Sequence, residues 1–293
     1  MQPDLIIVRY GEIGLKADIT RRFFENALIA NIKNALKKEK ISFEIKRQRG
    51  RIYIYADQIK KCLKFLKNIF GITSFSPAVS TSSDIKSMTK LALNLSKNKI
   101  SAKTSFALKV TRTGNHNYSS MDIAVVLGDA IVKKTKASVN LTKPDIKLYI
   151  EIRDKTSFFF YERLRGAGGL PLDSQGKVLA VIDSKKSILA TWYIARRGCV
   201  PFFSLIDKSL TECVKIFTKK WHINDLIEQS NLKDIKKLAQ QNNCDAVVTG
   251  YTIDDFAEIK KIKKQVKLSI LHPLIGLDDK EIDKKIVEIG LKL

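Results

Sequence analysis

The feature that most constrains the fold is the segment Arg165-Gly-Ala-Gly-Gly-Leu-Pro171, because the spacing of apolar residues differs on its two sides. Before it, short alternating strands are interleaved with helices, and Phe43 to Tyr55 has the pattern of a hairpin. After it, buried strands such as Val178-Leu-Ala-Val-Ile182 alternate with single helices, as in parallel α/β domains. Clusters of glycine and proline mark boundaries between structured segments. The sequence therefore predicts an α+β half followed by an α/β domain with a parallel sheet.

The half before this boundary is expected to hold two modules. From Leu5 to Val79 the order is strand, helix, two strands, helix and strand, which is a ferredoxin-like pattern. Thr20 is the expected N-cap of the first of these helices, and the second is expected over Ile59 to Phe70. A further basic module begins at Ser83 and contains two helices and three strands, the last ending at Glu162.

The charge of the chain points to a polyanionic partner. With 53 Lys and Arg against 30 Asp and Glu in 293 residues, the net charge is +23 and the isoelectric point is near 9.8. Residues 1–171 hold 32 basic and 14 acidic residues, a net of +18, whereas the remainder holds 21 and 16, a net of +5. No apolar run is long enough to span a membrane, so nucleic acid is the expected partner and no membrane is expected. A lysine-rich proteome would give the same composition and stays open.

Cysteine and histidine usage indicates neither a disulfide framework nor a metal site. The cysteines at 62, 199, 213 and 244 have no metal-binding spacing, and His116, His222 and His272 share no ligand spacing. A reduced, cytoplasmic setting is therefore expected, and no metal ligand is assigned.

Several short motifs occur along the chain in an order that is similar to one known family. They are Arg9-Tyr-Gly-Glu-Ile-Gly-Leu-Lys16, Leu141-Thr-Lys-Pro-Asp145, Ile150-Glu-Ile152, Gly168-Gly-Leu-Pro171, Val248-Thr-Gly250 and His272-Pro-Leu-Ile-Gly-Leu-Asp278. With these motifs the chain resembles the tRNA 4-thiouridine synthase family, also called tRNA sulfurtransferases or thiamine-biosynthesis sulfurtransferases. The resemblance implies a ferredoxin-like domain over residues 1–76, a THUMP domain over 77–166 that binds the acceptor region of tRNA, and a PP-loop ATP pyrophosphatase domain over 167–293.

Basic residues of the first half are the candidates for contact with RNA, since Lys and Arg neutralise phosphates and release counterions. They lie around one hairpin, on one strand, on one helix and next to the linker. The candidates are Arg47, Arg49, Arg51, Lys109, Arg112, Lys133, Lys134, Arg163 and Arg165. For each of these residues taken singly, a solvated surface position is the competing interpretation.

The α/β half departs from the pattern of the family at its phosphate loop. The family has Ser-Gly-Gly-x-Asp-Ser after the first strand, whereas this chain has Ile182-Asp-Ser-Lys-Lys-Ser187, in which only Ser187 matches. Without glycine, a close approach of the backbone to phosphate is harder to achieve. The residues that would still hold nucleotide are Val181, Ile182, Asp183, Ser184, Lys185, Lys186, Ser187 and Gly250. ATP and Mg²⁺ are the expected cofactors only if this loop still binds nucleotide.

The reactive cysteine of the family also has no counterpart, because the corresponding stretch is Gln229-Ser-Asn-Leu-Lys233. We therefore assign no catalytic residue and expect a tRNA-binding protein with a degenerate PP-loop domain. That domain would be a scaffold, a surface for a second copy of the chain, or a platform for a separate catalytic or sulfur-donor protein. Two alternatives stay open. One is an active ATP-dependent uridine-thiolating enzyme with an atypical loop and an external sulfur donor. The other is a nucleotide- or anion-binding regulator.

Overall fold

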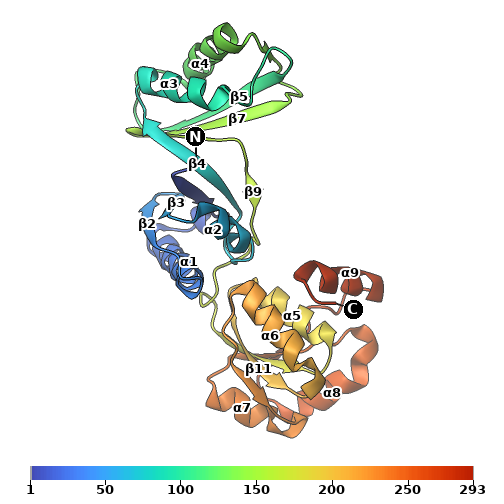
Figure 1. The fold of residues 1–293 in the computed structure, drawn as a ribbon. Helices are drawn as coiled ribbons and strands as arrows, with labels where there is room; N and C mark the ends of the chain where they lie inside the picture. Colours follow the sequence, from blue (N-terminus) through green and yellow to red (C-terminus); the bar gives the residue numbers. More distant parts are fainter. Residues whose placement is uncertain (1, 293) are drawn as a thin grey trace. The chain divides into compact units, whose positions relative to one another are not determined.

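The computed structural model describes residues 2–292, and these form two compact units that exchange chain segments. The first unit contains residues 2–8, 41–63 and 74–164, and the second contains 9–40, 64–73 and 165–292. Because the segments alternate along the chain, neither unit is one continuous stretch of sequence. Figure 1 shows the elements of each unit in order. None of the helices within residues 2–292 is long and apolar enough to cross a membrane.

The first unit is built on one large mixed sheet with the strand order β2-β3-β1-β4-β8-β7-β5-β6, in which β9 pairs with β4. Its strands are β1 (Leu5–Arg9), β2 (Phe43–Gln48), β3 (Arg51–Ala56), β4 (Ser74–Ser82), β5 (Ser105–Thr113), β6 (Ser138–Val139), β7 (Ile146–Arg153), β8 (Thr156–Phe160) and β9 (Leu164–Arg165). The expected hairpin is confirmed as β2 and β3, whose pairing closes at Gln48 opposite Arg51. Gly50, at φ +79°, supplies the left-handed residue of the two-residue turn between them.

Two helices cover one face of the part of this sheet that contains β5 and β7, namely α3 (Ile85–Ser96) and α4 (Ser120–Thr135). Met88 and Leu91 from α3 and Leu127 from α4 are buried with Phe106 of β5 and Leu148 of β7. Side chains of a strand alternate between its two faces, so every second residue of β5 and β7 reaches this layer. Each helix begins at an acceptor side chain, Asp84 for α3 and Ser119 for α4.

The second unit contains an all-parallel sheet with the order β12-β11-β10-β13-β14. Its strands are β10 (Lys177–Ile182), β11 (Val200–Leu205), β12 (Ile227–Gln229), β13 (Ala246–Val248) and β14 (Ser269–Leu271). Its helices are α1 (Asp18–Lys38), α5 (Lys185–Ala195), α6 (Thr211–Trp221), α7 (Ile235–Gln241), α8 (Phe256–Gln265) and α9 (Asp279–Ile289), and α2 (Ile59–Leu66) crosses from the first unit into this one.

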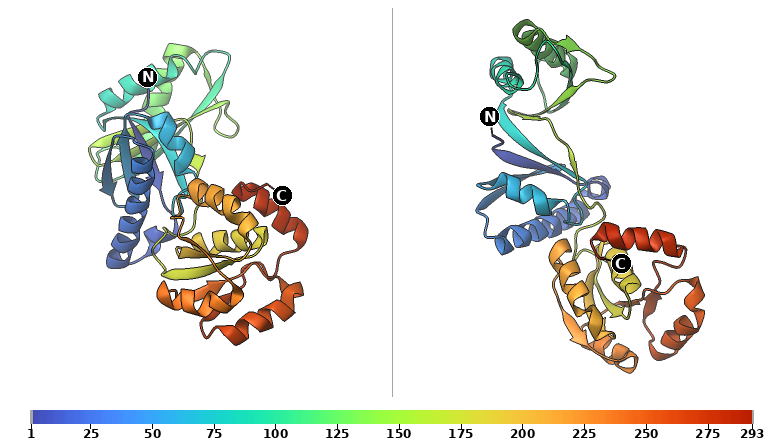
Figure 2. Two further views of the ribbon diagram at one scale, coloured as in Figure 1. Left: turned by 60° about the horizontal axis from the view of Figure 1, so that its bottom comes forward. Right: turned by 45° about the vertical axis from the view of Figure 1, so that its right-hand side comes forward.

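Alternate residues of β10 face two separate helical layers. Ala180 and Ile182 pack with α5, α6 and α9, whereas Leu179 and Val181 pack with α7 and α8. Figure 2 shows the two layers on opposite faces of the sheet. The chain proceeds from β10 to β11 and β12 on one side, then crosses to β13 and β14 on the other. The carboxyl ends of β10 and β13 therefore form the topological switch point, where ligands of open α/β sheets bind.

The linker that divides the sequence is firmly bonded. The amide of Gly166 donates to the carbonyl of Thr73, and the amide of Gly168 donates to that of Ile72. On the other side, the amide of Leu170 donates to the carbonyl of Arg196 at 2.9 Å. All of these bonds lie within the second unit, so the linker fastens residues 71–73 to the end of α5.

Several element boundaries differ from the expected ones. The first helix begins at Asp18 with Ala17 as its N-cap, so the expectation that Thr20 caps it is wrong. The second helix ends at Leu66 instead of Phe70, because residues 67–70 turn inward and bury Phe70 against Trp221. The sequence did not predict α8, whose lysine-rich stretch obscures a short apolar stripe.

Candidate functional site

The residues expected to hold nucleotide gather at the switch point of the parallel sheet. Asp183 follows β10 directly, and Ser184 is the N-cap of α5. Val181 and Ile182 are fully buried at the end of β10, so they support the loop by packing and are not accessible to a ligand. Gly250 follows β13, the neighbouring strand, and brings a second loop to the same edge. The structure thus places the predicted residues together.

The loop uses most of its own hydrogen-bonding groups. The amides of Asp183 and Ser184 donate to Oγ of Ser187, at 3.2 and 3.1 Å. The amide of Ser187 donates in return to Oγ of Ser184 at 3.4 Å, which completes a capping box. A phosphate loop needs such amides free to point at the ligand. In this loop three of them are directed to the two serine side chains.

Gly250 fills the space beside the first turn of α5. A Cβ atom at this position would lie 2.4 Å from the amide nitrogen of Ser187 and 2.7 Å from the carbonyl carbon of Lys186. The position therefore requires glycine for close packing of two backbones. The loop after β13 and the first turn of α5 are therefore in direct backbone contact at the switch point.

The two lysines of the loop differ in their surroundings. Nζ of Lys186 lies 2.7 Å from Oδ1 of Asp279, at the start of α9. This hydrogen bond raises the pKa of Lys186. Lys185 is half-buried and makes no ion pair within residues 2–292. Lys185 is thus the lysine of this loop with an uncommitted charge.

Tyr251 and His272, which the sequence analysis did not identify as site residues, also lie at the switch point. Burial, with the nearby carboxylate of Asp183, raises the pKa of Tyr251. Nδ1 of His272 lies 2.7 Å from Oγ1 of Thr249, and burial lowers the pKa of His272. Tyr251 directly follows the Val248–Gly250 motif, and His272 is the first residue of the His272–Asp278 motif. These motifs were the sequence feature from which both site residues could have been identified. The site therefore presents a phenol and a neutral imidazole near the loop.

No thiolate or metal centre accompanies this loop in the described part of the chain. Burial raises the pKa of Cys244 to about 11 and also raises that of Cys199. A thiol with a raised pKa is a poor nucleophile at neutral pH. Residues 2–292 contain no cluster of three or more His, Cys, Asp or Glu side chains that could hold a metal ion.

The basic residues expected to contact RNA form more than one group in the first unit. Arg49 lies in the β2–β3 turn, and its carbonyl accepts a hydrogen bond from Nη1 of Arg153 at 3.0 Å. Nε2 of His116 lies 2.7 Å from the carbonyl of Asp154, and Arg112 is 3.3 Å from Nδ1 of His116. The turn after β7 therefore brings the hairpin and the end of β5 together, although they are far apart in sequence.

The other candidates lie away from this turn. Lys133 and Lys134 are exposed in the last turn of α4, which leads to β6 beside the start of β5, whereas Arg112 is near the end of β5. Arg165 is exposed in β9, and Nε of Arg163 donates to Oγ of Ser74 at 3.1 Å. We name the basic surface around the turn, made of Arg47, Arg49, Arg112 and Lys155, the turn patch; all four are exposed. Lys109 lies outside it, because it pairs with Tyr149 in the middle of β5 and lies on the opposite face of that strand from Arg112.

Arg51 differs from the rest because it makes a structural ion pair. Its Nε atom lies 2.6 Å from Oε1 of Glu151, and Nε of Arg153 lies 2.9 Å from the same oxygen. Glu151 is only 5% exposed, so both guanidinium groups neutralise a buried carboxylate. This pairing joins β3 of the hairpin to β7 and was not visible in the sequence.

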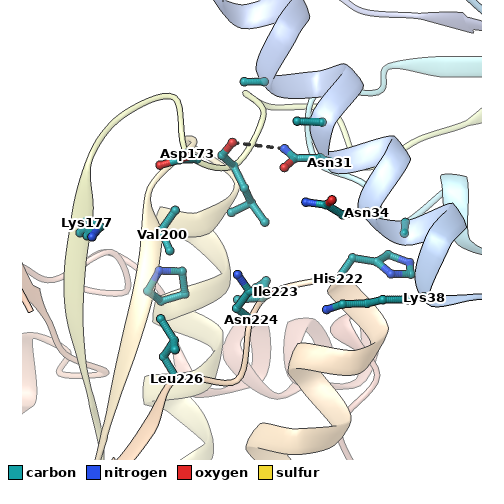
Figure 3. A pocket seen from close by; sticks show the side chains of 15 residues that line it. Asn31, Asn34, Lys38, Asp173, Lys177, Val200, His222, Ile223, Asn224 and Leu226 are labelled. Atoms are coloured by element: carbon teal, nitrogen blue, oxygen red, sulfur yellow. Dashed lines mark hydrogen bonds between the residues drawn. The ribbon is translucent and has the colours of Figure 1, made fainter. Parts of the chain in front are cut away.

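A separate cavity of about 370 Å³ lies between α1 and the amino-terminal edge of the parallel sheet (Figure 3). The side chains of Asn31 and Asn34 project from α1 toward the segment that carries Asp173, and Nδ2 of Asn31 donates to the carbonyl of Leu172 at 3.2 Å. Lys177 begins β10, so this cavity is at the opposite edge from Asp183. None of the predicted site residues lines it.

The chain matches family models along most of its length. Residues 5–76 match the ThiI ferredoxin-like domain, residues 82–161 match the THUMP domain, and residues 202–292 match the model described as thiamine biosynthesis protein (ThiI). The expected fold class, ferredoxin-like plus THUMP followed by a parallel α/β domain, is confirmed.

Solved structures show the same architecture. A crystal structure of PH1313 from Pyrococcus horikoshii has a TM-score of 0.86 at 27% identity and covers 99% of this chain and 100% of that one. A 4-thiouridine synthetase in complex with RNA, with bound ATP, has a TM-score of 0.81 at 26% identity and covers 99% of this chain and 85% of that one.

Curated relatives extend over the whole chain. A probable tRNA sulfurtransferase from Methanobrevibacter smithii is 34% identical, over 99% of this chain and 87% of the relative. Another from Methanocaldococcus jannaschii is 33% identical, over 97% and 87%. The first alignment is 337 positions long, which is 44 more than the 293 residues of this chain, so it contains gaps on the side of this chain. Identity of this extent, in agreement with the motifs and the fold, shows that the chain belongs to the tRNA sulfurtransferase family.

Proposed function

We propose that this protein binds tRNA at the acceptor region through the turn patch. The observation that carries the proposal is the convergence of Arg49 and Arg112 on the turn at Asp154, within a half of the chain that carries a net +18. Arginine and lysine in one exposed group act together on the phosphate backbone. The THUMP match and the RNA complex of the related synthetase support the same assignment. Lys133, Lys134, Arg163 and Arg165 would extend the contact.

The test is tRNA binding by the full chain over a series of salt concentrations. We expect a steep salt dependence, with the logarithm of affinity falling by about 0.9 for each phosphate contact per tenfold change in salt. Charge reversal at Arg49 and Lys155 together should weaken binding at least tenfold and reduce the salt slope by about 2. The matched control is reversal of Lys97 and Lys103 together, which are exposed at the end of α3 and in the loop before β5. Equal binding by both variants would exclude the turn patch.

We further propose that the α5 loop no longer holds the phosphates of ATP. The support is the capture of its amides by Ser184 and Ser187 and the packing of Gly250 on the first turn of the helix. The α/β domain would then be a scaffold, and a second copy of the chain or a separate catalytic or sulfur-donor protein would supply the chemistry. This role needs no side chain of the chain itself as nucleophile, in agreement with the raised pKa of Cys244.

An active uridine-thiolating enzyme with an atypical loop is the alternative. It is favoured by the uncommitted charge of Lys185 at the switch point and by the ATP of the related synthetase complex. It requires ATP consumption that is stimulated by tRNA and a sulfur donor and lost on Lys185→Ala. Absence of turnover in the wild-type chain, under conditions where tRNA binding is saturated, would decide against it.

A further inference from the structure

The α/β domain carries a strongly basic face of its own on α7 and α8. Both helices cover the same side of the sheet, since Ile235 and Leu238 of α7 and Ile262 of α8 share one buried cluster. Their outer surfaces are therefore neighbouring parts of one solvent-facing layer. We name this layer the lysine face. Its exposed lysines are Lys233, Lys236, Lys237, Lys260, Lys261, Lys263, Lys264 and Lys267.

The charge of the domain is concentrated on this layer. Within the bounds of α7 and α8 there are six lysines and one acidic residue, Glu258, a net of +5 over 17 residues. The helices of the other layer, α5, α6 and α9, hold eight lysines and five acidic residues, a net of +3 over 33 residues. Residues 172–293 as a whole carry only +5. Counted without a break from Lys233 to Lys267, the eight lysines are accompanied by five acidic residues, a net of +3. The excess of lysine is therefore confined to the two helices, and acidic residues occupy the loops between them.

The lysines of this face are free for an external anion. None of the eight makes an ion pair within residues 2–292, and Lys260 alone has a described aromatic contact, with its Nζ 4.5 Å from the centre of the Phe256 ring. By contrast, Lys186 of the opposite layer is bonded to Asp279. Unpaired ammonium groups in one patch repel each other and gain most from a polyanion.

A hollow of about 580 Å³ adjoins the lysine face at the free edge of the sheet. Its polar lining consists of Lys263 in the last turn of α8, Lys267 in the extended segment after this helix, Ser269 of the edge strand β14, and His272. The remaining lining is apolar and comprises Ile259, Val266, Leu268 and Ile270. His272 is also bonded to Thr249 at the switch point. The hollow therefore leads from the lysine face to the carboxyl edge of the sheet, with two lysines, a serine and a histidine among apolar side chains.

We propose that the lysine face and this hollow form a second RNA-binding surface, which holds the phosphate backbone of tRNA beside the switch point. The inference rests on the proposed tRNA binding and deepens it by assigning a contact to the α/β domain. Lysine is suited to this role because it meets phosphate as a mobile point charge and needs no base-specific geometry. The surface would guide RNA without reading its sequence.

The test is tRNA binding by the full chain that carries Lys263→Gln and Lys267→Gln. The matched control is the pair Lys280→Gln and Lys284→Gln, which has the same spacing and charge change on exposed positions of α9. We expect the substitutions at Lys263 and Lys267 to reduce the salt slope by about 2 and weaken binding several-fold, while the α9 pair leaves both unchanged. All four lysines are exposed, so the variants should fold.

The outcomes separate this inference from the proposed function. If both pairs bind like wild type while reversal at Arg49 and Lys155 weakens binding, the second surface is excluded and the turn patch stands. If both pairs weaken binding equally, the effect is one of overall charge and the inference also fails. If the wild-type chain shows no steep salt dependence, the proposed tRNA binding itself fails.

Discussion

At the scale of single residues, Glu151 adds a buried ionic contact between the β2–β3 hairpin and β7, which belong to the same sheet. Its carboxylate is buried and shared by Arg51 and Arg153 at 2.6 and 2.9 Å. Arg51 was expected to contact RNA, yet a guanidinium that neutralises a buried charge is costly to redirect. The sequence shows the arginine but not its partner, because the two residues are a hundred positions apart and meet only in the folded sheet.

We expect Glu151→Gln to destabilise the protein by about 2–3 kcal/mol, since two partly buried guanidinium groups lose their counter-charge. The control is Glu44→Gln, whose ion pair with Lys46 at 3.4 Å is exposed on both sides. Exposed pairs of this kind contribute about 0–1 kcal/mol. Urea unfolding of both variants measures the difference. Equal midpoints would contradict the structural role of Glu151.

His222 should make stability depend on pH. Burial lowers its pKa, the charge of Lys38 adds to this effect and that of Glu39 opposes it. The unfolded state therefore takes up a proton below the ordinary histidine pKa of about 6.5, while the folded state takes it up only at lower pH. Stability is complete above that value and falls as the pH decreases from about 6.5 toward the lower pKa of the folded state. Thermal unfolding between pH 7 and 5 should show a smaller decrease for His222→Gln than for wild type, and parallel curves would contradict this.

At the scale of elements, the linker shows how glycine determines a junction. A Cβ atom at Gly169 would lie 2.1 Å from the carbonyl oxygen of Arg196, and the φ of this residue is +73°. We expect Gly169→Ala to cost about 2–3 kcal/mol, from the clash and the left-handed backbone together. Gly128→Ala is the control, because nothing lies within 4 Å of its Cβ position in α4. That substitution should stabilise by about 0.5–1 kcal/mol. Unfolding midpoints that move in the same direction would contradict the assignment.

Strong local patterns made some elements predictable from sequence. The β2–β3 hairpin has alternating residues and a glycine turn, and β10 has an uninterrupted apolar run, so both were recognised. In α8 only Ile262 is buried, so lysines outweigh its apolar signal. The absence of glycine from Ile182–Ser187 was also visible. The hydrogen bonds from the backbone amides to the side chains of Ser184 and Ser187 could not be predicted from the sequence. They depend on side-chain rotamers at the start of α5.

At the scale of the whole molecule, the two units exchange chain segments, so a cut at the linker would not separate one unit from the other. Phe70 comes before the linker, yet it is 1% exposed and stacks on Trp221 with 5.1 Å between ring centres. We expect residues 1–171 alone to unfold at lower urea concentration than the same residues in the full chain. Without Trp221 the side chain of Phe70 is no longer buried, which lowers the free energy of unfolding by about 1.5–3 kcal/mol. Amide exchange of residues 64–73 measures this in both proteins. Unchanged protection in the fragment would contradict it.

The central claim is that the chain binds tRNA while its α5 loop does not take the phosphates of ATP. The charge supports the first part, with +18 before the linker and a further basic layer on α7 and α8. The bonded amides of Asp183 and Ser184 support the second. The most direct measurement is calorimetric titration of ATP, with magnesium, into the full chain, free and saturated with tRNA. The account predicts heat on tRNA binding and none on adding ATP in either state. Stoichiometric ATP binding in either state would contradict it.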